Sequence, residues 1–533
     1  MPLLLGIDIG TSSAKAVLFD PETGQTVAIA GQEYPLHKPA PDRAEQNPED
    51  WWQATITIVR QATEQAGRSD VAAISFSGQM HGTILLDRAG VPLHPAIIWA
   101  DQRSAAACAK LTATLGSERY AAIAGTLPAV GFQGPTLVWL AEYEPALLAH
   151  THQVILPKDY IRLRMTGEIA TEVSDAASTG IFDISRQAWA AEILAGVGLP
   201  ETLFPPVLAS TAVAGQLTRQ AAAKLGLSAG IPVIAGCADQ PAQAIGNGLV
   251  APGLAAVTTG SGGQVFVPLQ PAKETQGTKG TQGNSEILQV PMSSPEFPSS
   301  GQNILRTDPR LHVFNHAVPQ MWYVLGAILS AGLSLRWLRH VTGLAEAADA
   351  YPILSAEAAA VPPGADGLIF LPYLSGERTP HMDPLARGGF IGLSAYHTRG
   401  HLARAVMEGV AFALRQTLEI SLSLGGQVER VIAGGGGAES EVWRQIQADV
   451  FGLPLQQSLL SEQASVGAAL LAGVGAGLYP DLPAACQQTA HYGPITSPNP
   501  SRQAHYSEMY ARFSQLYPRL REDFHWLAGL KSN

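Results

Sequence analysis

The feature that most constrains the fold of this chain is a pattern that occurs twice, roughly half a chain apart. In each copy, a short apolar run leads into a turn of small residues, and a second apolar run follows directly. The first copy spans residues 3–19 around the turn Gly10–Ser13, and the second spans residues 254–267 around Gly260–Gly263. Apolar runs joined in this way are typical of a strand–turn–strand unit. The repetition predicts two similar domains, each with its own turn, although so short a match can also arise by chance.

The rest of the sequence alternates between helix and strand patterns, which predicts α/β layers with helices covering a mixed sheet. A length of 533 residues argues for two or more domains, which we place at residues 1–248 and 249–533. Helices are expected at residues 48–66, 321–340, 401–423, 440–452 and 464–475. Strands are expected at residues 71–76, 231–236, 367–372 and 431–433, with a hairpin or edge strand at 83–87.

One segment, residues 271–310, departs from this alternation. It is rich in Gln, Thr, Gly, Ser and Pro, a composition that rarely packs a core. We therefore expect a long surface insertion inside the second domain.

Composition and charge exclude several classes of protein. A hydrophobic share of 46% argues against disorder throughout. A net charge of −11 without a Lys/Arg cluster lacks the footprint of a nucleic-acid binder. Three widely spaced cysteines, Cys108, Cys237 and Cys486, exclude a disulfide scaffold and a cysteine-based zinc site. Because we find neither a basic leader nor an apolar stretch long enough to span a bilayer, we expect a cytoplasmic protein with no membrane partner.

Two common phosphate-binding loops, G-x-x-x-x-G-K-[ST] and G-x-G-x-x-G after a strand, are absent from the sequence. Tight hairpin turns whose N–H groups point at an anion remain as a means of binding phosphate. In Asp8–Ser13, the residues Gly10, Thr11 and Ser12 offer such groups, and Asp8 can hold a hydrated Mg²⁺ that also binds substrate phosphates. The alternative is an ordinary hairpin in which Asp8 accepts hydrogen bonds from the turn.

Two further motifs sit between an expected strand and an expected helix. Asp239 is either a base at the carboxyl end of a strand, where α/β sheets place ligands, or the N-cap of the helix. The run Gly434–Gly437 has more glycines than a turn needs, which favours a backbone that lies close to a flat or bulky ligand. The alternative for this run is a flexible tight turn.

Other polar and aromatic side chains near strand ends are candidates for a sugar pocket. His81 in QMHG contacts either a ligand or a structural hydrogen-bond partner. Trp99 and Asp101 in IIWADQR either line a sugar pocket or serve as packing and as a cap.

Five stretches, in this order, resemble the FGGY family of carbohydrate kinases. They are SGQMHGTILLD (77–87), LPKDYIRLRMTGEIATEVSDAAST (156–179), FLPYLSGERTPHMDP (370–384), GFIGLSAYHTRGHLARAVMEGV (389–410) and SEQASVGAALLAG (461–473). The resemblance runs from Leu4 to about Tyr517 and is interrupted by residues 271–310. It implies two actin-like, ribonuclease-H-like domains with the active site in the cleft between them.

The resemblance also implies roles for individual residues. Asp239 matches the catalytic base, and Met80 and His81, with Gln240, match contacts to the sugar. The nucleotide-binding matches are Asp8 and Gly10-Thr11-Ser12 at the first phosphate hairpin, Gly260-Ser261 at the second, and Gly434, Gly435, Gly436 and Gly437 against the adenosine.

The implied reaction is phosphoryl transfer from ATP, with Mg²⁺, to the 5-hydroxyl of D-xylulose, with Asp239 as general base. The motif QMHG favours xylulose. The alternatives are kinases that act on ribulose, a hexulose, glycerol or gluconate, and a non-catalytic regulator that binds sugar or nucleotide. The sequence does not fix the oligomeric state, for which a homodimer is one option.

The sequence departs from the family pattern at three places. Gly260-Ser261-Gly262 stands where Gly-Thr-Ser is usual, Gln240 where Asn is common, and Thr136 where the first family signature has Lys. The first two departures touch the implied site, so they bear on the identity of the sugar more than on the kinase chemistry.

Overall fold

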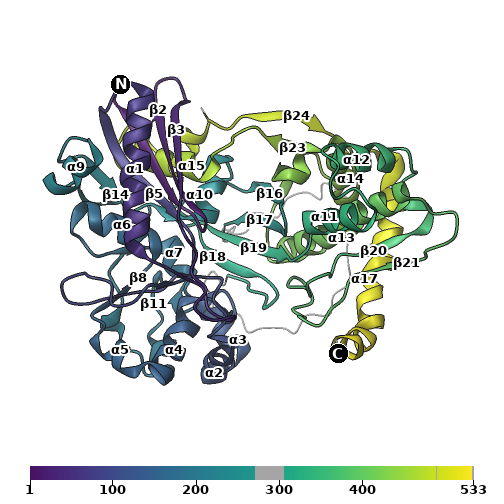
Figure 1. Ribbon diagram of the computed structural model, residues 1–533, viewed down its shortest axis with the longest axis horizontal. Helices are drawn as coiled ribbons and strands as arrows, with labels where there is room; N and C mark the ends of the chain where they lie inside the picture. The colour runs from purple at the N-terminus through teal and green to yellow at the C-terminus, as the bar shows by residue number, and fades with distance from the viewer. Residues whose placement is uncertain (271–304, 488, 531–533) are drawn as a thin grey trace, which may run out of the picture.

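A computed structural model of the chain describes residues 1–270, 305–487 and 489–530 (Figure 1). Most of the expected insertion at 271–310 therefore lies outside the described residues. The described part contains two large β-sheets with helices packed on them.

The first sheet has the strand order β13-β14-β5-β1-β2-β3, and β15 pairs with β5. Strands β1 and β2 and then β2 and β3 pair antiparallel, whereas β5 runs parallel to β1 and β14 parallel to β5. Leucine and isoleucine at successive positions of β1 are buried, as expected for a strand covered on both faces. The bounds are β1 Leu3–Ile9, β2 Ser13–Asp20, β3 Gln25–Glu33, β5 Val71–Gly78, β13 Val213–Gln216, β14 Pro232–Ile234 and β15 Cys237–Ala238.

The second sheet has the order β18-β19-β17-β16-β22-β23-β24. Strands β16, β17 and β19 form an antiparallel meander, while β22 runs parallel to β16 and β23 parallel to β22. The central strands of the two sheets therefore follow the same order and directions, which confirms the expected pair of similar α/β units. The bounds are β16 Gly253–Thr259, β17 Gly263–Leu269, β18 His312–Asn315, β19 Trp322–Ile328, β22 Val428–Gly434, β23 Leu455–Ser458 and β24 Tyr492–Thr496.

Helices α10 (Asp239–Gly246) and α15 (Gln463–Gly475) cross each other closely beside the first sheet. Glycines make this approach possible, because a Cβ on Gly467 would lie 2.0 Å from the carbonyl oxygen of Ala242. A Cβ on Gly6 of β1 would lie 1.9 Å from the carbonyl oxygen of Ser465. The small residues of the motif at 461–473 thus let a helix from late in the chain pack on the first sheet. The division at residue 248, in the turn after α10, stays a prediction.

Other helices cover the remaining faces. Helix α1 packs on the first sheet through Trp51, Trp52 and Ile58. Helix α13 forms much of the core beside the second sheet. The main helices are α1 Pro48–Ala66, α2 Ala105–Leu115, α3 Ser117–Ala124, α4 Gln133–Tyr143, α5 Pro145–His150, α6 Pro157–Thr166, α7 Val173–Ala177, α8 Ala191–Val197, α9 Arg219–Leu225, α11 Gly332–Val341, α12 Ala350–Ala359, α13 Arg399–Ser423, α14 Glu441–Phe451, α16 Leu482–Cys486 and α17 Pro500–Gly529. None of the helices in the described ranges is both long and apolar enough to cross a membrane.

One expectation about an element is wrong. Residues 321–340 do not form one helix, because β19 occupies Trp322–Ile328 and α11 begins at Gly332. The run WYVLGAI lies between β17 and β18 and is largely buried, and periodicity alone cannot distinguish such a strand from a buried helix. Of the two options for residues 83–87, the structure shows the edge strand. Strand β6 (Ile84–Leu86) forms no hairpin with the strand before it and pairs with β8 (Gln153–Ile155) in a two-stranded sheet.

Candidate active site

The candidate site begins where three parallel strands end side by side. Asp8 of β1, Ser77 of β5 and Cys237 of β15 lie in register across the first sheet. Strand β15 leads directly into α10, whose first residue is Asp239. The fold therefore brings Asp8 and Asp239 to the same edge of the sheet.

Among the described residues, one carboxylate oxygen of Asp239 has no hydrogen-bond partner. The N-cap of α10 is Ala238 rather than Asp239, and Oδ1 of Asp239 is buried without a hydrogen-bond partner among the described residues. Burial raises the pKa of Asp239 well above its usual value, and the charge of Asp8 raises it further. A buried acceptor without a partner is costly, so this oxygen is suited to a ligand.

Asp8 accepts a hydrogen bond at Oδ1 from the hydroxyl of Ser77, at 2.7 Å. Burial raises the pKa of Asp8, and the Ser77 bond partly offsets this effect. The residues of the described ranges contain no cluster of three or more His, Cys, Asp or Glu that could hold a metal ion. A divalent cation at Asp8 would therefore need substrate phosphates as further ligands, which is how Mg²⁺ is commonly bound.

The first hairpin turn is fixed by side chains from neighbouring segments. The N–H of Gly10 donates to the carbonyl of Ser13 at 3.1 Å. The indole N–H of Trp99 donates to the Thr11 hydroxyl at 2.9 Å, and the amide of Gln46 donates to the Thr11 carbonyl at 2.7 Å. Ser12 at the tip is exposed. Trp99, expected either to line a sugar pocket or to serve in packing, thus lies against the first hairpin turn.

The second hairpin turn and the glycine-rich loop lie together at the edge of the second sheet. Thr258 of β16 pairs with Gly434 of β22. A Cβ on Gly435, whose φ is 76°, would lie 2.7 Å from the carbonyl oxygen of Thr259. The carbonyl of Gly260 accepts a hydrogen bond from the N–H of Gly332, at 2.7 Å, where α11 begins. The structure thus joins Gly260-Ser261 and Gly434–Gly437 into one surface.

Helix α10 connects the two halves of the site. A small cavity of about 20 Å³ is lined by Gln240 and Gln243 of α10 and by Thr258 and Gln264 of β16 and β17. The helix that begins at Asp239 therefore packs against the two strands that carry the second hairpin turn.

His81 lies at the end of β5 in a fixed orientation. Its ring stacks on Phe132 with 3.9 Å between ring centroids, and its φ of 72° is unusual for a residue other than glycine. Nδ1 lies 2.6 Å from the carbonyl oxygen of Ser178, so it carries the proton and donates. Burial lowers the pKa of His81 to about 3. The ring is therefore neutral, and Nε2 is left as a hydrogen-bond acceptor. Met80 beside it is buried.

Asp101 does not join this group. Its carboxylate accepts hydrogen bonds from the backbone N–H of Ala44 at 2.7 Å and from the Arg103 guanidinium at 2.8 Å. Arg103 also pairs with Glu45, and all three side chains are buried. This placement supports a packing and capping role for Asp101 rather than a place in a sugar pocket.

Three residues that make contacts in this site, Ser77, Ser178 and Phe132, were not predicted from the sequence to have a role there. Ser77 and Ser178 both lie within quoted motifs. The hydroxyl of Ser77 was an available signal, whereas Ser178 contacts His81 through its backbone carbonyl, which its residue type does not reveal. Phe132 carries no signal of its own, because its contact with His81 depends on the tertiary fold.

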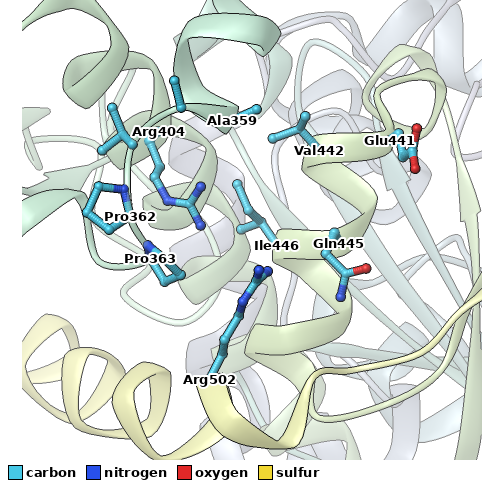
Figure 2. A pocket seen from close by; sticks show the side chains of 11 residues that line it. Ala359, Pro362, Pro363, Arg404, Glu441, Val442, Gln445, Ile446 and Arg502 are labelled. Atoms are coloured by element: carbon cyan, nitrogen blue, oxygen red, sulfur yellow. The ribbon is translucent and has the colours of Figure 1, made fainter.

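A separate pocket of about 500 Å³ lies between α12, α14 and α17, and the side chains of Arg404 and Arg502 point into it (Figure 2). Arg404 is already bonded to Glu408 and to the Tyr506 hydroxyl. None of the expected sugar or nucleotide residues lines this pocket.

Comparison with known proteins decides the family. Residues 3–246 match the N-terminal domain of the FGGY family of carbohydrate kinases, and residues 299–476 match its C-terminal domain. The chain belongs to the FGGY family of carbohydrate kinases. It is therefore an ATP-dependent sugar kinase with the two actin-like domains of that family.

Several FGGY kinases are similar to this chain over nearly its whole length. The xylulose kinase of Lactococcus lactis subsp. lactis is 34% identical over 531 residues, which cover 99% of each chain. The xylulose kinase of Escherichia coli is 35% identical over 97% of this chain and 99% of its own. The solved structure of the xylulose kinase from Rhodospirillum rubrum is 32% identical and superposes with a TM-score of 0.87, covering 98% of this chain and 100% of its own.

Proposed function

We propose that this chain is a cytoplasmic enzyme that transfers the terminal phosphoryl group of ATP to the 5-hydroxyl of D-xylulose, with Asp239 as general base. The observation that carries the proposal is the buried Oδ1 of Asp239, which has no partner among the described residues. Its neighbour Ala238 pairs with Gly78 of the sugar motif, and the next residue, Gln240, lines the cavity beside the strands of the second hairpin turn. The printed names of the similar FGGY kinases support xylulose as the sugar.

Phosphoryl transfer depends mainly on positioning and on stabilising charge, because its transition state is loose. The Gly10–Ser12 turn and the Gly260-Ser261 turn offer N–H groups and hydroxyls to the phosphates, and Gly434–Gly437 offers backbone to the adenosine. Mg²⁺, held by Asp8 and the phosphates, would supply positive charge. Asp239 takes the proton of the attacking hydroxyl, and its raised pKa brings it closer to the working pH of a base.

The sugar would lie between His81 and Asp239. Because Nδ1 of His81 donates to Ser178, its Nε2 accepts a hydrogen bond from a sugar hydroxyl. Met80 supplies an apolar wall, and Gln240, one residue beyond the base, faces the second sheet. The extra methylene of Gln240 compared with Asn makes it a residue that adjusts the fit of the sugar.

A panel of acceptors tests the proposal. ADP release would be measured with D-xylulose, D-ribulose, a hexulose, glycerol and gluconate at the same ATP concentration. We expect the highest kcat/KM with D-xylulose and formation of D-xylulose 5-phosphate. A higher kcat/KM with another acceptor would reassign the sugar. Calorimetry that shows sugar and ATP binding without any ADP formation would instead favour a regulator.

A further inference from the structure

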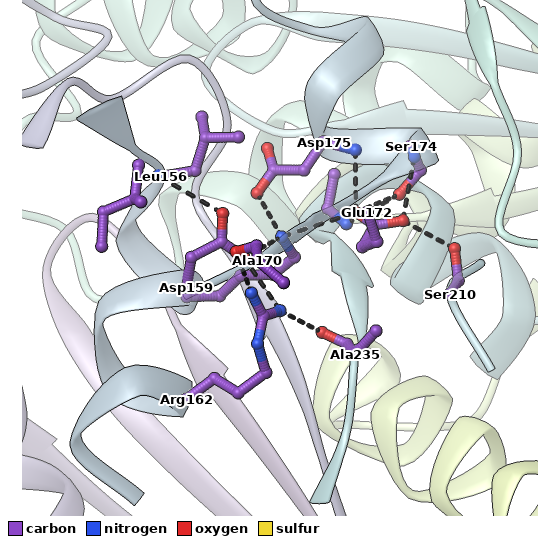
Figure 3. Close-up of polar contacts among 12 residues, drawn as sticks. Leu156, Asp159, Arg162, Ala170, Glu172, Ser174, Asp175, Ser210 and Ala235 are labelled. Atoms are coloured by element: carbon purple, nitrogen blue, oxygen red, sulfur yellow. Dashed lines mark hydrogen bonds and ion pairs between the residues drawn. The ribbon is translucent and has the colours of Figure 1, made fainter. Parts of the chain in front are cut away.

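A buried group of charged side chains lies behind the sugar motif, in the segment 156–179 that the proposed reaction does not use. It consists of Lys158, Asp159 and Arg162 from α6 and of Glu172 and Asp175 at α7, and each is at most 1% exposed (Figure 3). The ammonium of Lys158 lies 2.9 Å from Asp159, 3.5 Å from Glu172 and 2.8 Å from Asp175. Because buried ions cost solvation energy, their presence is weak evidence that the group serves mainly to stabilise the fold.

Two glycines of the sugar motif allow this group to lie directly behind it. A Cβ on Gly78 would lie 2.9 Å from Cβ of Lys158, and a Cβ on Gly82 would lie 2.7 Å from Cγ of Pro157. The start of α6 therefore contacts both ends of the Gln79–His81 stretch.

Glu172 joins the charged group to the short helix α7. Its carboxylate caps α7 by accepting hydrogen bonds from the N–H groups of Ser174 at 2.9 Å and Asp175 at 2.8 Å. It also accepts from the hydroxyls of Ser174 at 2.9 Å and Ser210 at 2.6 Å. Glutamate is not among the preferred N-cap residues. Here its longer side chain reaches Lys158 as well as the helix.

Helix α7 in turn contacts both sides of the proposed reaction centre. The Ser174 hydroxyl accepts a hydrogen bond at 3.1 Å from the N–H of Ala238, the residue before Asp239. The carbonyl of Ser178, directly after α7, accepts from Nδ1 of His81 at 2.6 Å. One short helix thus fixes the backbone that presents the base and the ring that contacts the sugar.

We propose that Ser174, held by Glu172 and the buried charged group, is a positioning residue that sets the place of the Asp239 carboxylate relative to the sugar bound at His81. This inference rests on the proposed function. The hydroxyl of Ser174 donates to Glu172, which orients its lone pair toward the Ala238 N–H. Without that acceptor the buried N–H is unpaired, and the strand end moves to find another partner. Misplacement of a reacting group by about 1 Å can slow a reaction by about 10²-fold.

Ser174→Ala and Ser210→Ala form a matched pair for the test. Both hydroxyls are buried and both donate to Glu172, but only Ser174 contacts Ala238. We expect Ser174→Ala to lower kcat by roughly 10- to 100-fold with the KM values for sugar and ATP within about twofold of wild type. Ser210→Ala should keep kcat within about threefold, even where both variants lose the same amount of thermal stability. Ser174→Thr, which keeps the hydroxyl, should restore most of kcat.

Equal kcat values for Ser174→Ala and Ser210→Ala would overturn the inference, as would a loss confined to the KM values. If Ser174→Ala does not fold, Ser174→Cys, which offers a weaker acceptor, takes its place under the same criteria. Asp239→Asn separates the two claims. If it impairs turnover while the two serine variants stay equal, the positioning role fails alone, and if it leaves turnover intact, the proposed base itself is wrong.

Discussion

At the scale of single residues, the proposed reaction depends on how burial and the charge of Asp8 change the pKa of Asp239. Burial and the carboxylate of Asp8 both make Asp239 hold its proton more tightly. A base with a raised pKa abstracts a proton more effectively once it is ionised. In the proposed reaction, a divalent cation at Asp8 would offset the Asp8 charge and so favour the ionised form of Asp239.

His81 offers a test of the sugar contact at this scale. We expect His81→Asn to raise the KM for D-xylulose by up to about tenfold, because one hydrogen bond contributes about 0.5–1.5 kcal/mol and about 1.4 kcal/mol corresponds to a factor of ten. Asn tolerates the φ of 72° at this position, so the backbone is retained. The KM for ATP should stay within about twofold. Steady-state kinetics with each substrate varied in turn would measure the two KM values separately. An equal rise in both would argue against a sugar contact.

The comparison of Asp239 with Asp101 shows what the sequence could provide at this scale. Both were candidates because each follows an expected strand. The structure gives Asp101 four protein donors, whereas Oδ1 of Asp239 has none among the described residues. The role of Asp239 as the base stays a prediction of the resemblance, and the difference in hydrogen-bond partners depends on tertiary contacts that no motif records.

At the scale of elements, close approach between helices decides how the late part of the chain packs on the first sheet. Gly246 and Gly467 lie where α10 and α15 cross, and a Cβ on Gly246 would lie 2.2 Å from the carbonyl oxygen of Gln463. Since the obstructing atoms belong to the backbone, no rotamer change can make room. The crossing in turn fixes the helix that begins at Asp239.

Gly467→Val tests this crossing. We expect it to lower the free energy of unfolding by about 3 kcal/mol or more, the upper end for overpacking, because its Cβ meets the Ala242 carbonyl. The matched control is Gly529→Ala near the end of α17, where a Cβ would meet nothing within 4 Å, and its stability should be unchanged or slightly higher. Chemical denaturation of both variants provides the measurement. A Gly467→Val protein as stable as wild type would contradict the described crossing.

Strand β19 is the element whose type could not be predicted from the sequence. The expected helices at 48–66, 401–423, 440–452 and 464–475 have counterparts in α1, α13, α14 and α15. Charged faces or caps made the period visible in α1, α13 and α14, whereas α15 was expected from its run of small residues. The run at 322–328, WYVLGAI, is apolar throughout and largely buried, so it has no polar face. The spacing of apolar residues in such a run therefore does not distinguish a strand from a helix.

At the scale of the whole molecule, two α/β units of the same strand order are joined by packing of α10 and α15. The repeated strand–turn–strand pattern in the sequence predicted this arrangement, since each copy opens one of the two sheets. The sequence could not show that α15 packs beside β1, because that contact joins residues more than 450 positions apart, Gly6 and Ser465.

Buried histidines make the stability of the whole molecule depend on pH. Burial lowers the pKa of His316 to about 3, and this side chain is 1% exposed. The unfolded chain takes up a proton at His316 near pH 6.5 while the folded chain does not, so acid favours unfolding by up to about 1.4 kcal/mol per pH unit below that point. We expect the stability difference between wild type and His316→Gln to shift by about 2 kcal/mol against wild type from pH 7 to pH 5. Chemical denaturation at both pH values would measure this shift, and a constant difference would contradict it.

The most direct test of the central claim is a single-turnover measurement of phosphoryl transfer from ATP to D-xylulose by wild type and Asp239→Asn, with calorimetry of both ligands on each protein. The account predicts that Asp239→Asn binds the sugar and ATP within about threefold of wild type and transfers the phosphoryl group about 10²- to 10⁴-fold more slowly. A transfer rate within about threefold of wild type would show that the proton leaves by another route and that Asp239 is not the base.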